Sequence, residues 1–349
     1  MTEFDLIRRY FTRAAPSALL GVGDDAALLQ VSAANVLAVS TDMLVSGTHF
    51  LHDADPYMLG CKTLAVNLSD MAAMGATPRW ATLAIALPDA DEAWLERFSA
   101  GFFALADQYG VELVGGDTTR GPLNLCVTIF GEVPAQQALR RSGAKIGDEI
   151  WVSGILGDAA LALAHLKNHV VLTADEFAAC APALHQPQPR VALGVALRGI
   201  ANSAIDISDG LLSDLGHILD ASQVAAEIDL ALLPISNVLR ARTTPPSLPN
   251  PSQPPLVRGG AGEEPSFPHD KGGSRGVKVF QQFVLSGGDD YELCFTAPVM
   301  RHAEILNIST RLELPLTCIG KIVVGRGCVV HDASGNLFDV EAGGYDHFR

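Results

Sequence analysis

Five groups of acidic residues stand at positions where folding could bring them together. Four lie beside or at the end of apolar runs, and one lies inside an apolar helical pattern; they are Asp24-Asp25, Asp42, Asp70, Asp117 and Asp206 with Asp209. Taken singly, an aspartate in a turn or at a helix N-terminus is usually a capping residue. Five such groups are better explained together, as a cluster of ligands for divalent metal ions.

Asp70 is the hardest of these residues to explain as a structural one. Its neighbours from Leu64 to Ala73 are nearly all apolar, and Asn67 lies on the same helix face. A carboxylate in such a helix must be paired, bound to a metal ion or solvated in a cleft. Asp42 and Asp206 end apolar strands, where α/β folds gather ligand-binding groups. The pattern therefore favours a metal site over chance placement.

Glycine-rich turns next to these aspartates suggest a phosphate ligand. Gly115-Gly116 precedes Asp117, and Gly21 and Gly23 flank the turn at Asp24. Backbone amides in such turns can approach phosphate oxygens, although the signal is weak by itself. Carboxylates repel phosphate unless cations lie between them, so this combination implies bound metal. The best basic candidates for phosphate contacts are Arg120, Arg141 and Lys145, each equally explained as an exposed solubilising residue.

Several enzyme classes are excluded by missing motifs. The sequence contains no P-loop G-x-x-x-x-G-K-[ST] pattern, no H-R-D and D-F-G set, no G-x-S-x-G and no H-E-x-x-H. A net charge of −15 without a lysine- or arginine-rich run argues against a nucleic-acid partner. No apolar run approaches the roughly 18 residues of a membrane span. The six scattered cysteines form no C-x-x-C pair, so we expect reduced thiols and a cytoplasmic protein.

The order of apolar patterns predicts two domains of an α/β or α+β class. A chain of 349 residues is long enough for both. Alternating or continuous apolar runs predict strands at 18–31, 35–41, 79–87, 111–115, 123–133, 149–153, 203–207, 224–230, 283–286, 291–296 and 316–323. Helical periodicity predicts helices at 56–75, 91–109, 157–167, 173–182, 187–201 and 210–221. The polar stretch 140–149 is a plausible junction, which gives domains 1–139 and 140–349.

Residues 243–276 differ from this pattern. They hold eight of the chain's 20 prolines and six of its glycines, with no apolar periodicity. Such a segment has little to bury, so we expect an exposed, largely disordered insertion. A role as a proline-rich ligand for a partner protein is the less favoured alternative.

With these motifs, the sequence resembles the thiamine-monophosphate kinase family, within the aminoimidazole ribonucleotide synthetase-like superfamily. The resemblance covers nearly the whole chain in family order, apart from the insertion. It rests on the segments GVGDDAALL (21–29), STDMLVSGTHF (40–50), KTLAVNLSDMAAMGA (62–76), GGDTTRGP (115–122), RSGAKIGDEIWVSG (141–154), NSAIDISDGLLSDLGHI (202–218), SGGDDYELCFT (286–296) and GYDHF (344–348).

The resemblance implies a transferase that phosphorylates thiamine phosphate with ATP, giving thiamine diphosphate in the last step of its biosynthesis. It also implies several Mg²⁺ ions and a homodimer formed through the N-terminal domain. The implied metal ligands are Asp25, Ser40, Thr41, Asp42, Asp70, Asp117, Asp206 and Asp209. The implied nucleotide contacts are Gly116, Asp117, Arg141 and Ser208. The implied thiamine phosphate contacts are His49, Asp289 and Tyr345.

One substitution and two rival functions bear on this interpretation. Asp289 stands where the family commonly has glutamate, which keeps the charge but shortens the side chain. A selenophosphate synthetase should carry a reactive cysteine in a glycine-rich N-terminal segment, whereas the first cysteine here, Cys61, falls in a predicted helix. A non-catalytic nucleotide sensor would not need the complete aspartate set. We expect no covalent nucleophile, because no activated serine or cysteine is recognisable.

Overall fold

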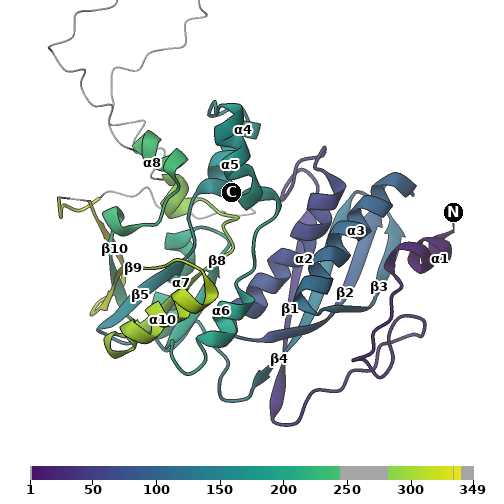
Figure 1. Ribbon diagram of the computed structural model, residues 1–349, viewed down its shortest axis with the longest axis horizontal. Helices are drawn as coiled ribbons and strands as arrows, with labels where there is room; N and C mark the ends of the chain where they lie inside the picture. Colours follow the sequence, from purple (N-terminus) through teal and green to yellow (C-terminus); the bar gives the residue numbers. More distant parts are fainter. Residues whose placement is uncertain (1, 244–281, 333, 339–349) are drawn as a thin grey trace, which may run out of the picture.

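One long helix lies between the two β-sheets of the protein (Figure 1). The computed structural model describes residues 2–243, 282–332 and 334–338. The predicted insertion at 243–276, apart from the backbone of Thr243, and the predicted ligand-binding Tyr345 lie outside these residues. Within the described part of the chain, no helix is long and apolar enough to span a membrane.

The N-terminal half is a four-stranded sheet with helices on one face. Its strands run in the order β1-β4-β2-β3, and only β2 and β3 are parallel. After a short helix α1 (Glu3–Leu6) and a π-helical turn η1 (Ile7–Phe11), the elements are β1 (Asn35–Val45), α2 (Pro56–Ala73), β2 (Thr77–Leu87), α3 (Glu92–Tyr109), β3 (Glu112–Arg120) and β4 (Asn124–Pro134). Helices α2 and α3 cover the same face, and no helix of the described residues covers the opposite face (Figure 1).

Helix α2 begins and ends where the sequence provides the signals. The Asp55 carboxylate accepts hydrogen bonds from the N–H groups of Tyr57 and Met58, and Pro56 occupies the first turn, where no N–H is needed. Fourteen of its 18 residues are buried. A helix that is apolar on nearly every side must be enclosed by other elements. α2 accordingly packs against the N-terminal sheet, α3 and the C-terminal half.

The C-terminal half is built around a six-stranded mixed sheet. The strand order is β10-β7-β9-β5-β8-β6. Its elements are β5 (Asp148–Ser153), α4 (Asp158–Leu166), α5 (Ala174–His185), α6 (Val191–Ala196), β6 (Ser203–Ile207), α7 (Leu211–Ser222), β7 (Ala225–Asp229), η2 (Leu230–Leu232), α8 (Asn237–Thr243), β8 (Glu292–Pro298), η3 (Val299–Arg301), α10 (His302–Leu312), β9 (Leu316–Val323) and β10 (Gly327–His331).

The central strands of this sheet contribute to two different cores. Along β5, Ile150 and Val152 belong to a core with α4, α5 and α7. Trp151 between them belongs to a core that also contains the buried residues of α2. This division follows from the alternation of side chains across a strand. One hydrophobic core therefore joins the two halves of the chain.

Three predicted elements differ from those observed. Residues 18–31 form only isolated bridges such as Leu20–Leu28, because glycines and adjacent aspartates weaken continuous pairing. Residues 282–286 are helical rather than a strand, since so short an apolar run does not distinguish the two. The predicted helix 187–201 shortens to α6, because Pro187 and Pro189 precede it. Helix α10 and strand β10 were not predicted.

All six cysteines are unpaired in the structure, and three of them, Cys61, Cys180 and Cys294, are buried.

Candidate functional site

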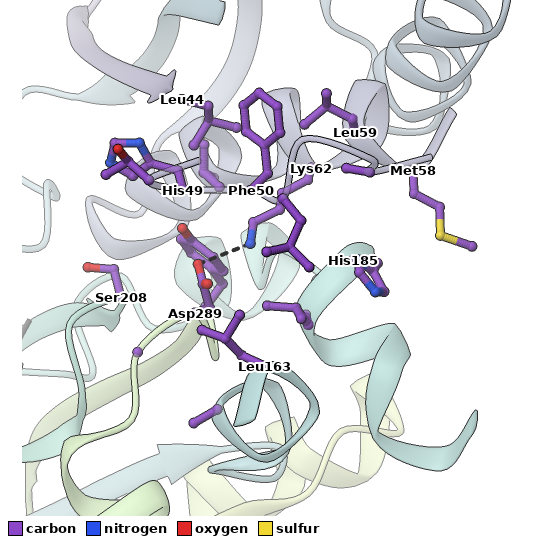
Figure 2. A pocket seen from close by; sticks show the side chains of 18 of the residues that line it. Leu44, His49, Phe50, Met58, Leu59, Lys62, Leu163, His185, Ser208 and Asp289 are labelled. Carbon is purple, nitrogen blue, oxygen red and sulfur yellow. Dashed lines mark ion pairs between the residues drawn. The ribbon is translucent and has the colours of Figure 1, made fainter. Parts of the chain in front are cut away.

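A cavity of about 1110 Å³ lies between the two halves. The N-terminal half contributes the end of β1, the following loop and α2; the C-terminal half contributes α4, α5 and the segments 206–209 and 286–291. In Figure 2, Lys62 of α2 and Asp289 of the C-terminal half point toward each other across it. The α2 residues Leu59, Lys62, Val66 and Asp70 line the cavity at the spacing of one helix face.

Three aspartates from three different elements meet at one end of this cavity. They are Asp42 of β1, Asp70 of α2 and Asp206 of β6. Burial, followed by the charges of Asp70 and Asp206, raises the pKa of Asp42 to about 7. Burial and then the charge of Asp70 raise the pKa of Asp206 to about 7. The proximity of these carboxylates makes it costly to ionise all of them together without a cation.

Neighbouring polar groups hold two of these carboxylates and the backbone of the third residue in place. The Ser40 hydroxyl donates to Asp70, and the Ser69 hydroxyl donates to Asp206 at 2.7 Å. The backbone N–H of Asp42 donates to the Asn67 side-chain oxygen at 3.2 Å. Asn67 therefore fixes Asp42 rather than pairing with Asp70. Ser40 and Asp42 lie on the same side of β1 because side chains alternate along a strand.

The carboxylates fit magnesium as an incomplete set of oxygen ligands. Among the described residues, no group of three or more His, Cys, Asp or Glu forms a preassembled metal cage. Mg²⁺ does not require one, because it usually keeps several water molecules and binds one or two carboxylates together with substrate phosphates. The raised pKa values of Asp42 and Asp206 show where added positive charge would relieve repulsion.

The turn after β6 is held by a carboxylate that was not predicted. Asp214, in the first turn of α7, accepts hydrogen bonds from the N–H groups of Ser208 and Asp209, both at 3.0 Å. Burial raises the pKa of Asp214 to about 7. Ser208 and Asp209 both line the cavity. An acidic residue in the first turn of the helix after Asp209-Gly210 was the available sequence signal.

Three of the expected metal ligands lie apart from this cluster. Thr41 faces the opposite side of β1, where its hydroxyl bonds to that of Thr128 at 2.9 Å. Asp117 is exposed on β3, three strand spacings or about 14 Å from β1. Asp25 is also exposed, and its N–H donates to the Asp24 side chain at 2.9 Å. Neither Asp25 nor Asp117 is among the described residues that line the cavity.

The expected nucleotide contacts are also divided. Ser208 lines the cavity, and the positive charge of Arg141 reaches the cluster, where it partly offsets the burial that raises the pKa of Asp70. Gly116 lies within β3, with a φ of 153°. A Cβ at Gly116 would stand 1.9 Å from the Leu83 carbonyl oxygen, so this position requires glycine for close strand contact. The close approach to β2 therefore accounts for a glycine at this position, and its contact with a nucleotide stays a prediction.

Two of the expected substrate contacts, His49 and Asp289, line the same cavity. The Nδ1 atom of His49 accepts the Val45 N–H at 2.9 Å, which places the proton of the neutral ring on Nε2. The Asp289 N–H donates to the Ser208 carbonyl at 2.9 Å, and the next residue, Asp290, accepts from the N–H of Gly157. These bonds fix the loop that presents Asp289 to the cavity.

Lys62 is a cavity residue that was not predicted. Its ammonium lies 3.2 Å from Asp289 Oδ1, and its side chain is only 5% exposed. The helical spacing of Lys62, Val66 and Asp70 could have placed it on the cavity face. Its partner Asp289, however, lies 227 positions further along the chain, and no local pattern in the sequence reveals that pairing.

The raised pKa of Asp42 predicts a pH-dependent stability difference. The folded protein holds this proton more tightly than the unfolded chain, so stability is lost as the pH rises from about 4 to about 7. The variant Asp42→Asn cannot ionise at this position and therefore avoids this loss of stability. In EDTA, the melting temperature of Asp42→Asn should exceed that of the wild type by a margin that grows from about pH 4 to about pH 7 and then stays constant. Thermal unfolding from pH 4 to 8 measures it.

The exposed rim residue Asp53 provides the control for this measurement. Asp53→Asn is measured over the same pH range to show the effect of a substitution at an exposed position. A margin for Asp42→Asn that does not grow with pH would show that Asp42 is not buried against other carboxylates in solution.

The sequence and the fold both match known proteins. Residues 23–133 match the family described as AIR synthase related protein, N-terminal domain. The thiamine-monophosphate kinase of Escherichia coli (strain K12) is 46% identical over 352 residues, covering 99% of this chain and 98% of the relative. That of Bacillus subtilis (strain 168) is 32% identical and covers 100% of both proteins.

Solved structures give the same result. The crystal structure of thiamine-monophosphate kinase from Stenotrophomonas maltophilia K279a matches with a TM-score of 0.77 and 45% identity, covering 94% of each chain. A structure of AaThiL complexed with AMPPCP and TMP matches with a TM-score of 0.71 and 29% identity, covering 91% of this chain and 89% of the other. With this identity over nearly the full length of its relatives, the chain belongs to the thiamine-monophosphate kinase family.

Proposed function

We propose that this protein transfers the γ-phosphoryl group of ATP to thiamine phosphate, giving thiamine diphosphate and ADP. The observation that carries the proposal is the cavity between the two halves, in which Asp42, Asp70 and Asp206 converge and which His49 and Asp289 also line. Family membership supplies the reaction class, and the cavity supplies a place where two phosphorylated molecules can meet.

The carboxylates would act by holding magnesium between the two substrates. Both substrates are polyanions, and bound Mg²⁺ would neutralise their repulsion and the charge that develops during transfer. Asp42, Asp70, Asp206 and Asp209 are the cavity residues suited to hold it. We propose that Asp25, Ser40, Thr41 and Asp117 complete the ligand set.

The other contacts follow the division of the cavity. We propose that Gly116, Asp117, Arg141 and Ser208 contact ATP, and that His49, Asp289 and Tyr345 contact thiamine phosphate. Asp289 offers a negative charge for the thiazolium cation. Apolar residues that line the cavity offer a surface for the uncharged ring; they are Phe50, Met58, Leu59, Leu163, Phe177 and Leu184.

The activity test uses the purified protein with ATP, MgCl₂ and either thiamine phosphate or thiamine. We expect thiamine diphosphate from thiamine phosphate and no consumption of thiamine. EDTA should abolish the reaction, and excess MgCl₂ should restore it. Consumption of thiamine itself, or no product from thiamine phosphate, would refute the proposed function.

We further propose direct transfer without a phosphoenzyme. The acceptor phosphate is already ionised near neutral pH, so it needs no strong general base, and positioning supplies most of the rate. Protein incubated with γ-labelled ATP and MgCl₂ alone should carry no label after denaturation. A stable label on His49 or on an aspartate would show a covalent intermediate instead.

The open face of the N-terminal sheet supports a homodimer. Along β1, Leu37, Val39 and Met43 alternate on this face, and Val39 and Met43 are 54% and 51% exposed. Apolar side chains gathered on one face of an edge strand are typical of an interface. Light scattering should give twice the chain mass; a monomer would contradict the dimer.

We also propose that 1–139 forms the nucleotide-binding and dimerisation domain and that 140–349 forms the second domain. We propose that the protein works in the cytoplasm.

A further inference from the structure

Lys62 joins the two halves inside the cavity. It lies on α2, with a side chain 5% exposed, and its ammonium lies 3.2 Å from Asp289 Oδ1 in the C-terminal half (Figure 2). A buried ammonium is stable only when paired. An ammonium can donate three hydrogen bonds. Lys62 therefore holds donor capacity that faces the cavity beyond its bond to Asp289.

The charges around the cavity make Lys62 distinctive. Seven aspartates line it: Asp42, Asp53, Asp55, Asp70, Asp206, Asp209 and Asp289. Among the lining residues that the structure describes, the lysines and arginines are Lys62 and Lys167. Lys167 is exposed, whereas Lys62 is buried. Among the described lysines and arginines that line the cavity, Lys62 is thus the buried one, and most of the charged side chains around it are acidic.

The proposed acceptor carries both charges that this ion pair presents. Thiamine phosphate has a thiazolium cation and a phosphate anion joined by a short ethyl arm. Asp289 suits the cation, and Lys62 suits the phosphate. The molecule can therefore enter between the two side chains with its charges matched to theirs.

We propose that Lys62 binds the acceptor phosphate, and that thiamine phosphate opens the Lys62–Asp289 ion pair by giving each side chain a new partner. This inference rests on the proposed function and deepens it. Every buried charge stays paired before and after binding, so the exchange avoids the large cost of an isolated buried charge. Lys62 would then hold the acceptor phosphate together with the metal ions.

The exchange also provides discrimination between thiamine phosphate and thiamine. Thiamine would take Asp289 through its thiazolium ring but would leave Lys62 without a partner. A site whose buried polar group is left unpaired rejects the analogue that lacks the matching group. Selection for the phosphorylated substrate would thus follow from this ion pair in addition to the metal ions.

The test measures binding of thiamine phosphate and of thiamine separately. Calorimetry is done on the full chain with MgCl₂ and a non-hydrolysable ATP analogue, which prevents turnover. Lys62→Met should weaken thiamine phosphate binding by roughly ten- to a hundredfold, the range for one charge-assisted hydrogen bond. It should leave thiamine binding unchanged or tighter, because Asp289 is no longer paired. Lys62→Arg should recover part of the loss.

Two further variants complete the experiment. Asp289→Asn should weaken both ligands but preserve the preference for thiamine phosphate, since Lys62 remains. Lys167→Met, which removes a lysine from the same cavity, should change thiamine phosphate binding by no more than about twofold, as expected for an exposed charge. Melting temperatures establish that each variant is folded. If Lys62→Met does not fold, the Lys62→Arg and Asp289→Asn preferences decide the question.

Several outcomes would overturn the inference. Equal weakening of thiamine and thiamine phosphate by Lys62→Met would mean that Lys62 only braces Asp289. If Lys62→Met weakened binding of the ATP analogue alone, Lys62 would belong to the nucleotide site. If Lys167→Met weakened thiamine phosphate binding as much as Lys62→Met does, the effect would come from the overall positive charge of the cavity and not from a specific contact. Loss of the phosphate preference in Asp289→Asn would also count against it. Wild-type protein that neither binds nor phosphorylates thiamine phosphate would instead remove the proposed function itself.

Discussion

Asp42→Asn and Asp70→Asn should each reduce turnover of thiamine phosphate by at least about a hundredfold, the usual loss when positioning or electrostatic stabilisation fails. Both residues line the cavity, burial raises the pKa of each, and the charges of Asp70 and Asp206 raise that of Asp42 further. Amide side chains keep the shape but lose the charge that holds magnesium. The measurement is steady-state turnover at saturating ATP over a range of MgCl₂ concentrations.

Both variants should remain folded, because removing one of several close carboxylates relieves repulsion in the metal-free protein. Asp53→Asn serves as the matched control, since Asp53 lines the same cavity from an exposed position. It should retain nearly full turnover. If Asp42→Asn and Asp70→Asn also retained it, these aspartates would be structural and the proposed metal site would be wrong.

Gly101→Ala should produce a large loss of stability for the addition of a single methyl group. Helices α2 and α3 approach closely, and a Cβ at Gly101 would stand 1.9 Å from the Tyr57 carbonyl oxygen. On the facing helix, a Cβ at Gly60 would stand 2.1 Å from the Phe98 carbonyl oxygen. Backbone atoms cannot rotate away, so the helices must separate. Overpacking of this kind lowers the free energy of unfolding by about 1–3 kcal/mol or more.

Urea unfolding measures the effect of Gly101→Ala, and Gly216→Ala is its matched control. Gly216 lies in helix α7 with no atom within 4 Å of its added Cβ. Alanine there should stabilise the protein by about 0.4–1 kcal/mol, through better helix propensity and a less flexible unfolded chain. If Gly101→Ala were equally harmless, α2 and α3 would not cross as closely as described.

Site residues that contrast with their neighbours in the sequence could be identified from the sequence alone. Asp70 is a charge within an apolar helical pattern, and Asp206 ends an apolar strand, so each indicated a site before its neighbours were known. Their convergence with Asp42 in one cavity followed from the fold class, which predicts that ligand groups gather at strand ends. Helices α2 and α3 were predictable because their caps and periodicity are strong.

Residues that act through distant partners could not be identified in this way. The role of Lys62 in its helix becomes apparent only when the fold places Asp289 beside it. The role of Asp214 likewise becomes apparent only when the turn at Ser208 brings backbone N–H groups to its carboxylate. The helical segment 282–286 was mistaken for a strand because its short apolar run fits either structure. The face on which Thr41 lies depends on the register of β1, which adjacent sequence does not determine.

The position of α2 has a consequence for how the enzyme moves. Its buried residues and those of β5, β8 and α10 belong to one continuous core, so neither half has a complete interior without the other. Hinge opening would expose that core to water. Heating should therefore give one cooperative transition in calorimetry, with no stage at which only one half has melted. During turnover, access must come from rearranging loops and side chains along the cavity wall, while the two halves keep their relative orientation.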